Sequence, residues 1–120
     1  MDELVGRLVA NVGVDRTVAE KSIGIILDFL MKEAPADKVQ PLMDQLPGAE
    51  ALQQEAASQG GGMFSMGGIM GAGTRLMGLG LSMGQVQGVT REIIAFAREK
   101  VGEDAVGEIV AAVPGLSQFV

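Results

Sequence analysis

Four residue types with distinctive chemistry are missing from this 120-residue chain, which has no cysteine, histidine, tryptophan or tyrosine. Without cysteine there is no disulfide framework and no thiol chemistry. Without cysteine or histidine, a zinc or other transition-metal site lacks its usual sulfur and nitrogen ligands. The common serine–histidine–aspartate arrangement is excluded for the same reason. We therefore expect no cofactor, no metal and no enzymatic activity.

Basic residues are also scarce, because nine Lys and Arg face fifteen Asp and Glu, for a net charge of −6. A nucleic-acid partner is therefore not expected, since phosphates require a basic surface. The acidic start, Met1-Asp2-Glu3, lacks the basic region of a signal peptide, so we expect a cytoplasmic protein. The sequence contains no run of about 20 apolar residues, which is the length that a membrane span requires. Peripheral contact with lipid stays an open alternative.

The chain aligns with itself at an offset of 67 residues, which places residues 12–52 over residues 79–119 without a gap. Seven of the 41 aligned positions are identical, among them Phe29 with Phe96 and Pro47-Gly48 with Pro114-Gly115. With 48% hydrophobic residues at helical spacing, the pattern predicts an all-α, internally duplicated small helical bundle. We expect one domain over residues 1–120, in which repeat 1 spans about 2–58, a Gly/Met-rich connection 59–73, and repeat 2 about 74–120.

Apolar periodicity and breaking residues predict helices over residues 2–11, 16–33, 37–46, 49–58, 73–78, 83–100 and 104–113. Gly13 is expected to end the first helix in a left-handed conformation. Asp15 and Ser82 are aligned before the two long helices, where both residue types serve as N-caps. Ser82 and Gln85 have the spacing of a capping box.

Asp37 and Asp104 recur at the start of the short third helices. Two such carboxylates could act as an acid–base pair or hold a divalent cation, but their position favours helix capping. Arg75 is the only charged residue between Glu55 and Arg91. It could hold an anion, although we favour a side chain whose stem lies on the surface and whose head reaches water.

Residues 60–73 read GGGMFSMGGIMGAG and contain seven Gly and three Met. The segment could be a flexible linker between the repeats. It could also be a close helix–helix contact, because its glycines fall at a spacing that lets backbones approach. A third interpretation is an adaptable apolar surface for a partner or lipid, since methionine fills irregular grooves.

A long helix containing Ile-Ile-Leu-Asp-Phe-Leu is followed by a short helix, by Leu-Pro-Gly-Ala-Glu-Ala-Leu at residues 46–52, and by a Gly-rich stretch. In this order the chain resembles small bacterial proteins of unknown function, of the VcgC/VcgE type. The likeness covers both repeats, about three quarters of the chain. It implies an all-helical fold and a bacterial source, and no activity or functional residue comes with it.

We therefore predict a non-enzymatic interaction or scaffold module whose apolar centre contacts another chain, which could be a copy of itself. The residues expected to make this contact are Met63, Phe64, Met66, Ile69, Met70 and Met77. The alternative is a carrier of a small apolar ligand or lipid. Its pocket would lie between the two repeats and would be lined by Phe29, Phe96 and the same methionines.

Overall fold

The computed structural model describes residues 2–60, 68–113 and 115–119, and for residues 59, 60, 68–70, 118 and 119 it describes the backbone alone. Within these ranges the chain forms seven α-helices, one short 3-10 helix and no strand, so the all-α class is confirmed. The elements are α1 (Asp2–Asn11), α2 (Arg16–Glu33), α3 (Ala36–Asp44), α4 (Ala49–Gly60), α5 (Gly68–Met77), α6 (Met83–Val101), α7 (Glu103–Ala112) and the 3-10 helix η1 (Leu116–Phe119).

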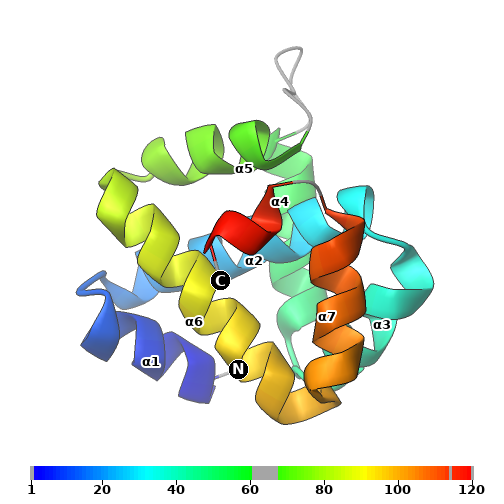
Figure 1. Cartoon of the computed structure of the whole chain (residues 1–120). Coiled ribbons are helices and arrows are strands. Elements are labelled where there is room, and N and C mark those ends of the chain that lie inside the picture. The colour runs from blue at the N-terminus through cyan, green and yellow to red at the C-terminus, as the bar shows by residue number, and fades with distance from the viewer. Residues whose placement is uncertain (1, 61–67, 114, 120) are drawn as a thin grey trace.

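Helix α2 occupies the middle of the molecule and packs against α1, α3, α4, α5 and α6 (Figure 1). Residues 22–30 of this helix are all buried. A helical segment that is buried on every side has to be apolar on every side. Residues 22–30 are apolar apart from Ser22 and Asp28. The Ser22 hydroxyl is satisfied locally, because it donates to the carbonyl of Val18 at 2.8 Å. Asp28 finds one partner on its own helix, Lys32, and two on other helices, Gln53 and Arg75.

The two halves of the chain bury matching positions. Every buried residue described between 79 and 116 lies 67 positions after a buried residue of the first half. These pairs are Val14/Leu81, Ala19/Val86, Ser22/Val89, Ile23/Thr90, Ile26/Ile93, Leu27/Ile94, Phe29/Phe96, Leu30/Ala97, Val39/Val106, Leu42/Ile109, Leu46/Val113 and Ala49/Leu116. The turn glycines Gly13 and Gly80 match as well, with φ angles of 82° and 96° that favour glycine over other residues.

The halves differ most clearly in a second buried face on α2. Gly24, Ile25 and Asp28 are buried, whereas 67 positions later on α6 Arg91 is exposed and Ala95 is half-buried. Helix α4 covers this face of α2 in close contact. A Cβ atom placed on Gly24 would lie 2.4 Å from the carbonyl oxygen of Leu52, so only a residue without a side chain fits there.

Most predicted helices are found within two residues of their expected ends, but α5 begins five residues before the expected start at residue 73. Glycine disfavours helices, and the glycines of this segment led to the shorter prediction. Packing reverses that preference, because Gly71 and Ala72 are buried and small side chains let α5 lie close to its neighbours. The predicted connection 59–73 therefore contains the end of α4 and the first half of α5.

The capping predictions have mixed outcomes. Ser82 and Gln85 form the expected capping box, in which the Gln85 amide donates to the Ser82 hydroxyl at 3.2 Å. Asp15 is at the N-cap of α2 but makes no side-chain capping bond. The prediction for Asp37 and Asp104 is wrong. Pro35 and Gly102 occupy the N-cap positions of α3 and α7, and both aspartates fall in the first helical turn, where a negative charge favours the helix dipole.

Candidate functional site around Arg75

Arg75 lies on the side of α5 that faces α2. Its neighbours Ala72 and Leu76 are almost fully buried, and this anchors α5 to the core. Arg75 comes one residue before Leu76, so its side chain lies at the edge of the same buried face of α5. The Arg75 side chain is accordingly only 25% exposed. The expectation that its head lies in water is wrong, because the buried Asp28 stands opposite.

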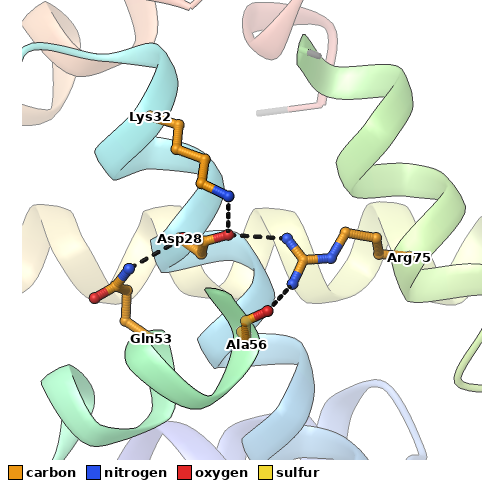
Figure 2. A network of polar contacts seen from close by, with 5 residues as sticks. All are labelled: Asp28, Lys32, Gln53, Ala56 and Arg75. Carbon is orange, nitrogen blue, oxygen red and sulfur yellow. Dashed lines mark hydrogen bonds and ion pairs between the residues drawn. The ribbon is translucent and has the colours of Figure 1, made fainter. Parts of the chain in front are cut away.

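The guanidinium of Arg75 is held by two groups from different helices, as Figure 2 shows. Nη1 donates to Oδ2 of Asp28 on α2 at 2.9 Å, and Nη2 donates to the carbonyl oxygen of Ala56 on α4. Asp28 receives two more contacts, from Nζ of Lys32 at 3.0 Å and from Nε2 of Gln53 at 3.0 Å. We call these five residues the Asp28 network. It joins α2, α4 and α5 at one point.

Asp28 is ionised despite its burial. Its side chain is 1% exposed, and this burial acts to raise the pKa. Hydrogen bonds from Arg75, Lys32 and Gln53 act in the other direction and together hold the pKa below its ordinary value of 3.8. Both oxygens of the carboxylate are engaged, Oδ1 by Gln53 and Oδ2 by Arg75 and Lys32. The network therefore fastens α2, α4 and α5 together.

Beside Arg75 the surface forms a pocket of about 350 Å³, bounded by α2, α4 and α5. Its apolar lining consists of Ile25, Leu52, Ala56 and Leu79, and its charged lining of Glu20, Lys21, Glu55 and Arg75. The remaining lining residues are Thr17 and Gly78. Apolar walls with a few polar groups are typical of small-molecule sites. Among the described residues, no group of three or more acidic side chains is placed to hold a metal ion.

Comparison of the chain with protein-family models, curated proteins and solved structures found no match.

Of the six residues predicted to contact a partner, Met77 is the one whose side chain the structure describes. It is 48% exposed, although it stands on the same helix as the buried Leu76. Ile69 and Met70 belong to α5, but their side chains lie outside the described part. Met63, Phe64 and Met66 lie outside the described residues altogether.

The two phenylalanines predicted to line a carrier pocket are in the core. Phe29 is 6% exposed and Phe96 is 1% exposed, and neither lines the pocket beside Arg75. Cations cover the ring of Phe96, since the guanidinium of Arg7 and the ammonium of Lys100 each lie 5.2 Å from its centroid. Contacts of this kind stabilise a packed aromatic ring.

Sequence reasoning missed Asp28. A signal for it was present, because Asp28 is the one charged residue between Lys21 and Lys32 in an otherwise apolar helix. Buried charges are almost always paired. The lone Arg75 of the second half is the complementary signal, and the pairing of these two residues would have placed α5 against α2.

The described helices contain no segment that is both long enough and apolar enough to cross a lipid bilayer.

Proposed function

We propose that this protein is a non-enzymatic interaction or scaffold module whose contact surface lies along α5 and the connection that precedes it. The supporting observation is the placement of exposed apolar side chains. The large hydrophobic residues that are exposed in the described part are Val9, Met77 and Met83. The two methionines flank the turn between α5 and α6, while Val9 stands on α1. Methionine adapts its shape to varied partners, and exposed apolar groups mark interaction sites.

The proposal assigns the contact to the six predicted residues, Met63, Phe64, Met66, Ile69, Met70 and Met77, and adds Met83. The Asp28 network supports this assignment in a physical way. Arg75 ties α5 to α4 through Ala56 and to α2 through Asp28. The helices on both sides of residues 61–67 are therefore held in place, and a partner that binds here pays less for ordering the flanking structure.

We also infer that the chain arose by duplication of one helical unit. The offset of 67 residues, the matched burial in the two halves and the paired turn glycines Gly13 and Gly80 support this inference. In each half a short helix, a long helix and a second short helix follow one another, as α1–α2–α3 and as α5–α6–α7. Helices α1 and α5 both pack against the two long helices α2 and α6.

Substitutions test the interaction surface better than a deletion of residues 60–73, because that deletion would remove the buried Gly71 and Ala72. Met77→Asp places a charge on the surface without disturbing the core. Val9→Asp is the matched control, since Val9 is also a large exposed hydrophobic residue, 41% exposed, and stands on α1 away from the proposed surface. A third variant replaces residues 61–67 by a Gly/Ser sequence of equal length.

Each variant is compared with the unmodified chain by cross-linking in native lysate and mass spectrometry, and by sedimentation velocity of the pure protein. Circular dichroism verifies that helicity is unchanged. We expect the unmodified chain and Val9→Asp to form the same cross-links, to a partner or to a second copy, and Met77→Asp and the replaced segment to lose them. Identical cross-links in all four proteins, or none in any of them, would show that the surface is not an interaction site.

A carrier of a small apolar ligand or lipid is the second candidate. It is favoured by the pocket beside Arg75, whose walls are partly apolar. The predicted lining by Phe29 and Phe96 does not apply to this pocket. A carrier would retain its ligand through purification, so native mass spectrometry and lipid extraction of the purified protein test it directly. A bound lipid at stoichiometric amount supports the carrier, and its absence from fully folded protein argues against it.

A further inference from the structure

The pocket beside Arg75 has a charge arrangement that limits what it can bind. Its lining offers two cations, Lys21 and Arg75, and two carboxylates, Glu20 and Glu55. The apolar part of the lining consists of Ile25, Leu52, Ala56 and Leu79. The lining is therefore neutral overall and combines both signs of charge with apolar surface.

Contacts between helices hold two parts of the pocket lining in place. Helices α2 and α4 are in backbone contact beside it, where Gly24 meets the carbonyl oxygen of Leu52. Arg75 is held in one orientation by Asp28 and Ala56 (Figure 2). A guanidinium has five N–H donors, and these two contacts use one donor of each terminal nitrogen. Since a quarter of the side chain is exposed, Arg75 can offer remaining donors to a ligand.

The other charged groups are more accessible. Glu20 lies 3.7 Å from Nε of Arg16, which is a long and exposed ion pair. Within the described part of the chain, neither Lys21 nor Glu55 takes part in an ion pair. Both are exposed. Lys21 on α2 and Glu55 on α4 are thus available, with opposite charges, on two helices that border the same pocket.

We propose that this pocket binds a small zwitterion with an apolar body, of the class of the apolar amino acids. The carboxylate is held by Arg75 and Lys21, the ammonium by Glu55 and Glu20, and the apolar side chain rests on Ile25, Leu52 and Leu79. A ligand with a single charge satisfies one pair of groups and meets repulsion from the other pair. A volume of about 350 Å³ leaves room for a ligand of this size. This proposal does not depend on the interaction surface around Met77.

The test is isothermal titration calorimetry of the full chain with free L-leucine. Two analogues separate the contributions of the charges: 4-methylpentanoate lacks the ammonium group, and isopentylamine lacks the carboxylate. We expect L-leucine to bind and each analogue to bind at least about tenfold more weakly, the loss that follows when a charged group loses its partner. An absence of binding by L-leucine, or an analogue that binds as well as L-leucine, overturns the proposal.

Variants at exposed positions locate the binding without disturbing the fold. Lys21→Gln and Glu55→Gln each remove one charge from the lining, and Glu33→Gln removes an exposed charge from α2 outside the pocket. We expect affinity for L-leucine to fall about tenfold or more in the first two variants and to stay unchanged in the third. Equal affinity in all three variants would place the binding elsewhere and overturn the site. Unchanged thermal unfolding in each variant ensures that the comparison concerns folded protein.

Discussion

Arg7 on α1 and Arg75 on α5 each reach across to the long helix of the other half of the chain. Arg7 pairs with Glu99 on α6 at 2.6 Å, where the two side chains are 28% and 51% exposed. Arg75 pairs with Asp28 on α2, whose side chain is 1% exposed. The same kind of contact is therefore made once at the surface and once in the interior. This difference in burial decides how much each pair contributes.

The first prediction compares the two arginines. Arg75→Met leaves the buried Asp28 with weaker compensation, and loss of one partner of a buried ion pair costs about 3 kcal/mol. Arg7→Met breaks an exposed pair, for which a much smaller loss is expected, because solvent screens the two charges. Urea unfolding followed by circular dichroism measures both. Equal losses would mean that the Asp28 network does not fasten α5 to the core.

A double variant separates the loss of the ion pair from the cost of leaving the Asp28 charge buried without Arg75. Asp28→Leu together with Arg75→Met replaces both charges by apolar groups of similar size, and such replacements are often neutral or stabilising. The free energy of unfolding of the double variant is therefore expected to exceed that of Arg75→Met alone. A double variant less stable than either single variant would contradict this account.

The second prediction concerns pH. The pKa of Asp28 is lower in the folded protein than in the unfolded chain, so its contribution to stability is present above the ordinary pKa of about 4. That contribution is lost as pH falls through the folded pKa. We therefore compare the free energy of unfolding of the unmodified chain with that of Asp28→Asn. The difference between them should be constant near neutral pH and become smaller in acid. The chain has no histidine, so no histidine-dependent step is expected near pH 6 to 7.

Urea midpoints measured from pH 7 down to pH 2 for both proteins check this dependence. Glu99→Gln serves as a comparison, because the pKa of Glu99 is also lowered, by its hydrogen bond from Arg7, but the side chain is half exposed. Its effect on the pH profile should be smaller. A difference between the unmodified chain and Asp28→Asn that grows as the solution becomes more acidic would contradict the assignment.

Local signals made most of the fold predictable from the sequence. Gly13, Gly80 and Ser82 act through the conformation of their own backbone or through a residue three positions away, so sequence spacing is enough to recognise them. The matched burial of Phe29 and Phe96 likewise follows from helical periodicity. These features depend on contacts that are close in the sequence.

Contacts distant in the sequence were not predictable in this way. The start of α5 at Gly68 depends on packing of Gly71 and Ala72 against other helices, which outweighs their low helix propensity. The pairing of Arg75 with Asp28 joins residues 47 positions apart. The failure of Asp37 as a cap is local instead, because Pro35 already occupies the N-cap position of α3. The pocket beside Arg75 depends on the packing of α5 and on the pairing of Arg75 with Asp28, so the sequence did not predict it either.

The third prediction concerns the two aligned cap positions. Ser82 accepts a hydrogen bond from the Gln85 amide, whereas Asp15 makes no side-chain capping bond. Ser82→Ala should therefore reduce the free energy of unfolding by about 1 kcal/mol, the usual loss of an N-cap. Asp15→Ala should cost clearly less, since its remaining role is the attraction of its charge to the helix dipole. Thermal unfolding of the two variants measures which of them loses more stability. A larger loss for Asp15→Ala would show that its carboxylate caps α2 after all.

The fourth prediction concerns the contact between α2 and α4. In Gly24→Ala the new Cβ atom would lie 2.4 Å from the Leu52 carbonyl oxygen and 3.0 Å from its carbonyl carbon. Because both atoms belong to the backbone, the helices have to move apart, and overpacking of this kind costs about 1–3 kcal/mol. Gly107→Ala is the matched control, since it is also in a helix and its Cβ would meet no atom within 4 Å.

At Gly107 the alanine is expected to stabilise the protein by about 0.5–1 kcal/mol, because it favours the helix and restricts the unfolded chain. The two Gly→Ala changes should therefore shift the urea midpoint in opposite directions. The same separation of α2 from α4 would widen the pocket beside Arg75, so Gly24→Ala should also weaken any binding of L-leucine there. A Gly24→Ala protein as stable as the Gly107→Ala protein would mean that α4 does not lie against α2 as closely as Gly24 requires.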